Sequence, residues 1–345
     1  MISHLNIPAL SDLHVHLREG NLLKQVAPYT DRCCAYAVIM PNLTPPVAAV
    51  DRLNGYREAL KSELKSTTPL MTFKLLGTTT PEAVCSLQSV GASAGKLYPE
   101  GVTTNSADGI GRDWLEHPER FPGFLDALGE MERLELVLCL HGEMPGAFCL
   151  DRERQFLPFV GWLLDSFPRL RVVLEHITTA DAVRFVSDRT SRGKRLAATI
   201  TLHHLMLTLD DVIGDKLRPH HFCKPVAKRP EDMEALWQVI RSRHPAFFLG
   251  SDSAPHPVSD KECSEGCAGV FSAPVLPELL VQFFEQRDAL DALSGFVAHH
   301  GNAFYRLPTP EKILRLETES WRVPSEYGGV VPLAAGQELD WKLAV

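Results

Sequence analysis

The chain alternates short apolar runs, rich in β-branched residues, with longer amphipathic stretches. Eight apolar runs predict strands, at residues 12–17, 35–40, 70–76, 95–98, 134–140, 171–174, 196–200 and 246–249. The stretches between them predict helices, for example at 51–65, 156–167, 180–190 and 230–243, with Pro, Asp, Thr or Ser near their starts. Strand and helix alternating eight times predict an α/β fold, a TIM-type (β/α)8 barrel of parallel strands. A doubly wound open sheet is the alternative, but no G-x-G-x-x-G motif follows the first strand.

Residues that bind metals or carry protons stand at the ends of several predicted strands. Such barrels hold their active sites at the C-terminal ends of the strands, so we expect these side chains to converge on one rim. In chain order they are His14, His16, Asn42, Lys96, His141, His176 and Asp252. For any one of them alone, a hydrogen-bonded polar residue at a strand end is the simpler interpretation.

His14 and His16 are the most informative pair. Side chains alternate along a strand, so two histidines one residue apart point to the same face. Residues 7–17 are mostly apolar, which predicts a buried strand end. Two adjacent neutral imidazoles are half of a transition-metal site. The alternative is a pair that only packs and hydrogen-bonds.

The number of ligands matters as well as their type. Four histidines and Asp252 supply five N or O ligands, whereas a catalytic zinc takes three protein ligands and keeps one open position. Five ligands are too many for one ion and too few for two without a bridging group. Lys96 as an ammonium repels cations, and its spacing alone favours a salt bridge. A buried lysine can, however, lose its proton, and a neutral amine can add CO₂ to form an anionic carbamate.

The composition of the chain limits the partners and the cellular compartment that we expect for this protein. The 345 residues are 45% hydrophobic and 23% charged, as in an ordinary soluble protein, and the net charge of −8 argues against nucleic acid or an anionic membrane as a main partner. The eight cysteines are scattered, which is typical of a reducing cytosol. Cys263 and Cys267 lack a second ligand pair and are interpreted as loop cysteines. The chain shows no N-terminal signal pattern and no apolar run long enough to span a membrane, so we expect a cytoplasmic protein.

Taken together, the motifs resemble those of one enzyme family. They are DLHVHLR at 12–18, MPN at 40–42, GKLYP at 95–99, HGE at 141–143, EHIT at 175–178 and GSDSAPH at 250–256. In this order, over residues 7–307, the chain resembles the dihydroorotases, in particular the compact monofunctional class within the amidohydrolase superfamily. The resemblance implies one zinc held by His14, His16 and Asp252, and a second held by His141 and His176. It also implies that Lys96 is carboxylated (N6-carboxylysine) and bridges the two ions.

The resemblance also implies the reaction. Dihydroorotases catalyse the reversible cyclisation of N-carbamoyl-L-aspartate to L-dihydroorotate and water, a step of de novo pyrimidine (UMP) biosynthesis. Asp252 is then the catalytic residue that takes a proton from water and delivers it to the leaving amide nitrogen. Two zinc ions outweigh the negative charges of the carbamate, Asp252 and a hydroxide, which leaves a positive centre for an anionic substrate.

The substrate carboxylate calls for an arginine fork. Arg18 lies two residues past His16, on the same face if the strand continues. By resemblance, Asn42 and His256 are further carboxylate contacts, while Ala268 and Lys224 stand at positions where backbone groups meet the substrate. The Lys224 side chain could add positive charge to the pocket or point to solvent, and we expect the latter. His203 and His204 follow the seventh strand and are interpreted as structural.

The loop at 99–111 contains three glycines and many small polar residues, which predicts a mobile segment with little apolar area to hold it down. It begins three residues after Lys96. The family resemblance implies a lid whose Thr103 and Thr104 hydroxyls reach the substrate. An ordinary flexible connection is the alternative.

Two other functions remain open. A hydantoinase or allantoinase would share the metal ligands, but such relatives carry a long β segment before the H-x-H motif that forms a small second domain with the C-terminus. Only thirteen residues precede His14, which we expect to leave no room for it. A barrel retained as a regulatory protein would usually have lost ligands. We therefore predict a barrel over 1–307 and an extension of short strands and turns over 308–345, packed on the barrel. The resemblance alone implies a homodimer.

Overall fold

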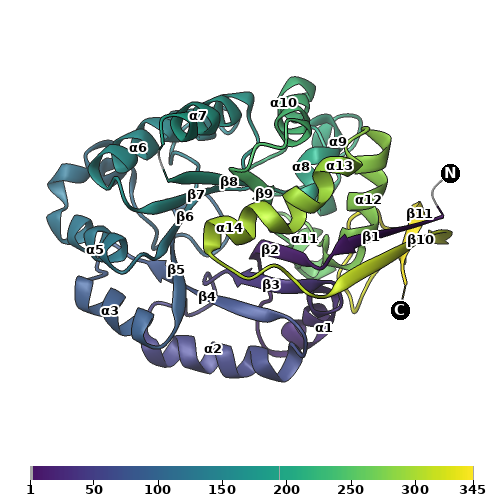
Figure 1. The fold of residues 1–345 in the computed structure, drawn as a ribbon. Coiled ribbons are helices and arrows are strands. Elements are labelled where there is room, and N and C mark those ends of the chain that lie inside the picture. The colour runs from purple at the N-terminus through teal and green to yellow at the C-terminus, as the bar shows by residue number, and fades with distance from the viewer. Residues whose placement is uncertain (1–2, 194, 345) are drawn as a thin grey trace.

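The computed structural model describes residues 3–193 and 195–344. Within them, eight parallel strands form a single sheet in sequence order, with helices around it (Figure 1). The strands are β2 (Leu10–Val15), β3 (Cys34–Ile39), β4 (Thr68–Leu75), β5 (Ala92–Leu97), β6 (Val137–His141), β7 (Arg171–Glu175), β8 (Leu196–Ile200) and β9 (Phe247–Leu249). The predicted TIM-type barrel is confirmed, and each of the eight predicted strands overlaps an observed one.

The barrel closes between the first and last strands, just past their ends. The backbone N–H of Asp252 donates to the carbonyl of His14 (2.8 Å), and the N–H of His16 donates to the carbonyl of Ser253 (3.1 Å). The carboxylate of Asp12 supports this seam by accepting bonds from the N–H (2.8 Å) and the hydroxyl (2.6 Å) of Ser251. The seam thus joins two segments that the sequence separates by more than two hundred residues, and both carry predicted metal ligands.

The helices follow the strands as crossover connections. They are α1 (Gly20–Asp31), α2 (Val50–Glu63), α3 (Pro81–Ser89), α4 (Arg112–Glu116), α5 (Pro122–Arg133), α6 (Arg152–Ser166), α7 (Ala180–Ser191), α8 (Leu202–Met206), α9 (Asp210–Ile213), α10 (Pro230–Arg241), α11 (Val258–Lys261), α12 (Leu276–Gln286), α13 (Leu290–Ser294) and α14 (His300–Tyr305). The four predicted helices correspond to α2, α6, α7 and α10. Among the helices described, none is long and apolar enough to cross a lipid bilayer.

Local chemistry explains several of these boundaries. The Thr179 hydroxyl caps α7 by accepting a bond from the Ala182 N–H, and Pro230 occupies the first turn of α10. The fifth strand was predicted to begin at residue 134 but begins at Val137. Helix α5 runs to Arg133, and Glu135 takes a left-handed conformation with φ of 54° that ends the helix before the strand starts.

The described residues also form a second sheet, which the sequence did not predict in this form. Strand β1 (His4–Pro8) pairs antiparallel with β10 (Ile313–Arg322), which pairs with β11 (Glu338–Leu343). This sheet lies at one side of the barrel, close to both ends of the chain (Figure 1). The sequence predicted no strand before the H-x-H motif, but five of the thirteen residues there suffice to pair with the C-terminal extension. Trp341 and Asp340 of β11 bond Glu285 and Gln282 of α12, which ties the sheet to the barrel.

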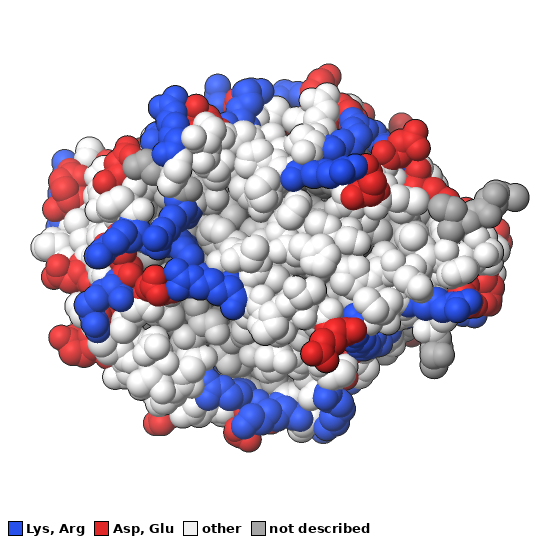
Figure 2. Space-filling view, viewed as in Figure 1, with Lys and Arg blue, Asp and Glu red and all other residues white. Residues whose placement is uncertain are grey.

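The surface carries both signs of charge. On the face shown in Figure 2, Lys and Arg side chains alternate with Asp and Glu around the rim, while the centre is mostly uncharged.

Candidate metal centre and active site

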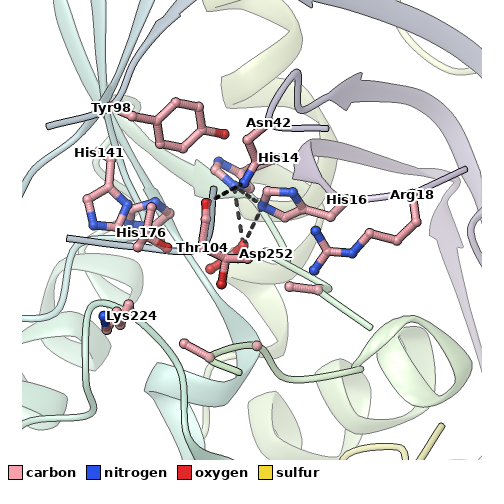
Figure 3. A pocket seen from close by; sticks show the side chains of 14 residues that line it. His14, His16, Arg18, Asn42, Tyr98, Thr104, His141, His176, Lys224 and Asp252 are labelled. Atoms are coloured by element: carbon pink, nitrogen blue, oxygen red, sulfur yellow. Dashed lines mark hydrogen bonds and ion pairs between the residues drawn. The ribbon is translucent and has the colours of Figure 1, made fainter. Parts of the chain in front are cut away.

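A small cavity opens at the C-terminal ends of the strands (Figure 3). Its lining comes from strand ends and from the loops that follow them. It consists of His14, His16, Arg18, Asn42, Tyr98, Thr103, Thr104, His141, His176, Lys224, Asp252, Ala254, Ala268 and Gly269. Of the thirteen predicted site residues, eleven line this cavity. The other two, Lys96 and His256, lie against residues of the lining.

The first cluster in the cavity is His14, His16 and Asp252. The Nε2 atoms of the two histidines lie 3.3 Å apart, and Asp252 Oδ1 lies 3.3 Å from His14 Nε2 and 3.2 Å from His16 Nε2. All three residues are buried, at 1%, 8% and 7% exposure. Gly250 permits this close approach, because a Cβ there would lie 2.9 Å from the Cβ of His14. The ligand atoms of the three residues lie within 4.8 Å of one another, a spacing that one metal ion can bridge.

The charge states of this cluster suit a cation. Burial lowers the pKa of His16 to about 3 and lowers the pKa of His14, so both imidazoles are neutral near pH 7. Burial also opposes ionisation of Asp252, but its interactions with His14 and His16 outweigh this effect and hold the carboxyl pKa well below its usual value. Neutral imidazoles and an ionised carboxylate are the forms that bind zinc.

The second cluster consists of His141 and His176, at the ends of β6 and β7. Their ring centroids lie 4.7 Å apart, and the His176 ring lies 4.9 Å from that of His14. His176 has a left-handed backbone with φ of 43°, held by its N–H bond of 2.7 Å to the Thr199 hydroxyl. Its Nδ1 atom is buried and unpartnered among the described residues. A buried nitrogen without a partner is costly unless a ligand satisfies it, so this atom fits a metal ion.

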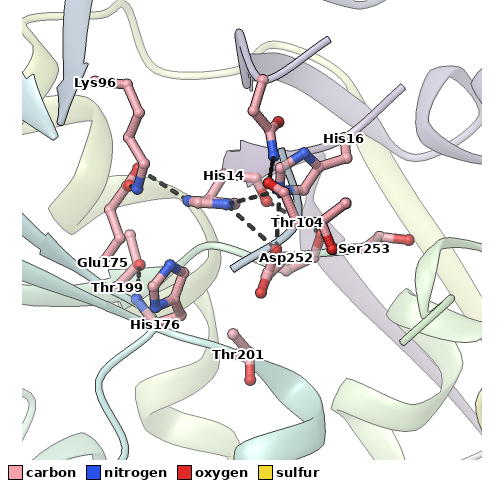
Figure 4. Close-up of polar contacts among 12 residues, drawn as sticks. His14, His16, Lys96, Thr104, Glu175, His176, Thr199, Thr201, Asp252 and Ser253 are labelled. Atoms are coloured by element: carbon pink, nitrogen blue, oxygen red, sulfur yellow. Dashed lines mark hydrogen bonds and ion pairs between the residues drawn. The ribbon is translucent and has the colours of Figure 1, made fainter. Parts of the chain in front are cut away.

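Lys96 lies fully buried behind the two clusters, at 0% exposure. Its ammonium contacts Glu175 Oε2, and the other oxygen of Glu175 lies 2.9 Å from His14 Nδ1 (Figure 4). The salt bridge that the sequence favoured by spacing is therefore the arrangement seen here. Burial lowers the pKa of Lys96 to about 7, so near that pH Lys96 is a neutral amine in about half of the molecules. A neutral amine next to metal ligands has the chemistry needed to add CO₂.

Arg18 lies at one side of the cavity. Its Nε donates to the Pro255 carbonyl (3.1 Å), and its Nη2 lies 2.9 Å from His256 Nε2. Burial lowers the pKa of His256 to about 3, so the neutral ring accepts the bond from the guanidinium. Arg18 has five N–H donors, and these two contacts orient the fork while leaving donors for an anion.

The loop after β5 covers the cavity and is anchored more firmly than predicted. Asn42 Nδ2 donates to the Thr104 carbonyl (3.3 Å), and Asn105 Nδ2 donates to the Asn42 carbonyl (3.0 Å). The expectation of little apolar anchoring is wrong, because Val102 and Ile110 are each only 1% exposed. These side chains were hidden in a stretch whose composition is mostly small and polar. Both predicted lid threonines, Thr103 and Thr104, line the cavity.

Lys224, Ala268 and Gly269 form another wall of the cavity. The Lys224 side chain was expected to point to solvent, but it is half-buried and belongs to the cavity lining (Figure 3). The N–H of Gly269 donates to the Phe222 carbonyl (2.9 Å), which joins the two backbone segments of this wall.

Sequence reasoning missed several supporting residues. Glu175 pairs with Lys96 and His14, and Glu143 lies 2.8 Å from His141 Nε2. Glu153 of α6 accepts bonds from the backbone N–H groups of Thr178 and Thr179, both at 2.9 Å, which holds the loop after His176. Glu175 and Glu143 could have been found, because each lies within two residues of a predicted ligand. Glu153 could not have been found in this way, because its partners Thr178 and Thr179 lie beyond strand β7 in the chain.

One further cluster lies outside the cavity lining. His203, His204 and Cys223 are buried, with ligand atoms within 4.8 Å of one another. The His204 ring already bonds the Thr201 hydroxyl (2.8 Å) and the Pro225 carbonyl (3.0 Å), and the Cys223 thiol donates to the same carbonyl (3.3 Å). These bonds are consistent with the structural role expected for His204.

Comparisons with known proteins test the resemblance. No family model matches the chain. Among curated proteins, the dihydroorotase of Nitrosomonas europaea is 44% identical over 346 residues, covering 96% of each chain. The chain belongs to the dihydroorotase family. Among solved structures, a dihydroorotase from Saccharomyces cerevisiae, in complex with 5-fluoroorotic acid, has a TM-score of 0.92 at 36% identity and covers 99% of each chain.

A second dihydroorotase structure, from Campylobacter jejuni, has a TM-score of 0.90 at 38% identity, covering 100% of this chain and 99% of that one. Membership of the dihydroorotases makes the chain a metal-dependent hydrolase of the amidohydrolase superfamily. The family predicted from the motifs is therefore confirmed over the full length of the chain.

Proposed function

We propose that the chain catalyses the reversible cyclisation of N-carbamoyl-L-aspartate to L-dihydroorotate and water, as a step of pyrimidine biosynthesis. The observation that carries the proposal is the convergence of four neutral histidines, an ionised Asp252 and a buried Lys96 on one cavity, with Arg18 at its side. This combination provides metal ligands, a proton carrier and a carboxylate receptor within one small volume.

The same residues support a site for two zinc ions. His14, His16 and Asp252 would hold one ion, and His141 and His176 the other. Lys96, whose pKa of about 7 leaves much of it neutral, would add its amine nitrogen to the carbon of CO₂ and release a proton. The resulting carbamate would bridge the ions, and Glu175 would then lose its cationic partner. When bound, the metals supply Lewis-acid polarisation of a carbonyl oxygen and activation of water.

Asp252 is the proton carrier in this proposal. In ring opening it accepts a proton from the attacking water and delivers it to the amide nitrogen that leaves. In cyclisation it accepts the proton of the ureido nitrogen and returns it to the carboxylate-derived oxygen that leaves as water. Its low pKa keeps it ionised and ready to accept a proton. Its bonds to His14 and His16 aim the carboxylate into the cavity.

Arg18, Asn42 and His256 would bind the carboxylate that the substrate keeps throughout the reaction. His256 and Pro255 orient the guanidinium of Arg18, so less side-chain freedom is lost when the anion binds. Thr103 and Thr104 from the lid, and backbone groups at Lys224 and Ala268, would close around the ring. A hydantoinase acts on rings that need no such carboxylate, so Arg18 favours dihydroorotate as the substrate.

Three further expectations belong to this proposal. We infer a homodimer, a cytoplasmic location, and a functional barrel of residues 1–307 with the extension 308–345 as an appendage. Light scattering of the purified protein distinguishes a dimer from a monomer. Because β1 pairs with β10, removing residues 308–345 would also unpair the N-terminal strand, and we expect it to destabilise the barrel.

The test is a direct assay with the purified protein in both directions. Dihydroorotate should be hydrolysed and carbamoyl aspartate cyclised, while hydantoin and dihydrouracil should react poorly. Removing divalent metal with a chelator should abolish both reactions, and zinc should restore them. Metal analysis should find about two zinc ions per chain. Fully active protein with one stoichiometric metal would contradict the bridged pair, and preferred hydrolysis of neutral rings would contradict the substrate.

A further inference from the structure

A second buried lysine lies outside the metal centre. Lys261 ends helix α11 and is only 3% exposed, although the helix itself lies in a surface loop. Its ammonium bonds three backbone carbonyl oxygens, those of Phe222 (3.0 Å), Cys267 (2.9 Å) and Gly269 (2.7 Å). An ammonium has three N–H donors and no acceptor, so these three carbonyls satisfy it completely. A protonated lysine is therefore the form that fits this position.

The three carbonyls belong to the two backbone segments that form one wall of the cavity. Phe222 stands two residues before Lys224, and Cys267 and Gly269 flank Ala268. Lys224, Ala268 and Gly269 line the cavity. Residues 222–224 and 267–269 lie outside helices and strands, so no regular hydrogen-bond ladder fixes their position. They depend on specific anchors instead.

The Phe222 carbonyl is the centre of this anchor. It accepts both the Lys261 ammonium and the backbone N–H of Gly269, so one oxygen joins both segments. The wall is also tightly packed: a Cβ at Gly269 would lie 2.3 Å from the Ala254 carbonyl and 2.9 Å from the His256 ring. A small displacement of either segment would therefore reach the ring that orients Arg18.

We propose that Lys261 is a positioning residue for substrate binding: it holds segments 222–224 and 267–269 together as the wall against which the anionic substrate binds. This role deepens and rests on the proposed function. Burial of an unpaired charge is expensive, but an ammonium whose three donors all bond is an effective cross-link between irregular segments. Its positive charge also lies near His256, because the ammonium bonds the carbonyl of Gly269, and Gly269 packs against the His256 ring.

The test compares Lys261→Met with wild type in the zinc-loaded enzyme. Methionine retains the length and apolar stem but donates no bond. We expect KM for dihydroorotate and for carbamoyl aspartate to rise roughly ten- to hundredfold, the range for loss of charge-assisted hydrogen bonds. Turnover at saturation should fall much less, and zinc content should stay at the wild-type level, because Lys261 contacts no metal ligand.

Lys228→Met is the matched control. Lys228 is also buried, at 4% exposure, and its ammonium donates to the Val226 carbonyl (2.8 Å), outside the cavity lining. This variant should lower thermal stability without raising KM. If Lys261→Met does not fold, Lys261→Gln decides the question, since its amide keeps two donors without charge and should raise KM by a smaller factor.

An unchanged KM in a folded Lys261 variant would overturn the positioning role, even if turnover and thermal stability both fell. Equal increases in KM in the Lys261 and Lys228 variants would overturn it too. None of these results touches the proposed function, which fails only if the wild-type protein itself does not interconvert the two substrates.

Discussion

The metal side of the cavity and its substrate side are built in different ways. His14, His141 and His176 lie in strands or directly after them, and the ladder of the barrel sets their positions. Lys224, Ala268, Thr103 and Thr104 lie in loops, whose positions depend on bonds made by Lys261 and Asn42. The comparison teaches that ligands of a metal can be read from the strand pattern, whereas the substrate wall depends on anchors that lie elsewhere.

The largest effect should come from Lys96, which links both sides of the metal centre. Lys96→Ala should abolish activity, because two cations would lose the anion expected to join them, and small carboxylic acids should partly restore it. The assay is turnover with and without added acetate, together with zinc content. Lys74, the register neighbour of Lys96 on β4, provides a control for zinc content only, because its ammonium donates to the Asn105 carbonyl in the loop at 99–111 (2.8 Å). Lys74→Ala should retain both zinc ions, and near-normal turnover in Lys96→Ala would remove Lys96 from the site.

Asp252→Asn should separate metal binding from proton transfer. An amide oxygen can still coordinate a metal but cannot carry a proton, so the variant should keep much of its zinc yet lose turnover by roughly 10²–10⁴-fold. Steady-state kinetics and metal analysis on the same preparation measure the two properties. A loss of less than about tenfold would be incompatible with the assigned role.

Arg18→Met should weaken the substrate side alone. Loss of a charge-assisted hydrogen bond costs about 1.5–3 kcal/mol, which corresponds to roughly one to two decades in affinity for dihydroorotate. Calorimetric titration of the metal-loaded protein measures this loss, and zinc content should not change. If the affinity is unaffected, the substrate is a ring without a carboxylate at this position.

The smallest effect should come from the lid. Thr103→Ala and Thr104→Ala should each reduce activity by roughly two- to tenfold, the range for one neutral hydrogen bond. Zinc content and thermal stability should remain near wild type, since neither hydroxyl supports the barrel. Hydrogen exchange of residues 99–111 should also slow when carbamoyl aspartate is added. Normal turnover in the double variant would make this segment a connection only.

The sequence by itself determined the barrel and the metal side of its site. The apolar runs predicted all eight strands, because the spacing of apolar residues along a strand is visible in the sequence. The residues after these runs predicted the site, because parallel strands of a barrel bring their C-terminal ends to the same rim. The motif order was specific enough to identify the family, which the comparisons confirm.

Only the tertiary structure decided which distant groups meet. It paired Lys96 with Glu175, placed Lys224 in the cavity lining, joined the first strand to the C-terminal extension, and bonded Lys261 to three carbonyls from two loops. Apart from the bonds of Lys261 to the nearby Cys267 and Gly269, these contacts join segments far apart in the chain, and no periodic pattern predicts any of them. Their energy depends on burial, which lowers the pKa of Lys96 to about 7 and makes every unmade hydrogen bond costly. Burial is a property of the folded barrel, so these contacts could not be read from the order of residues.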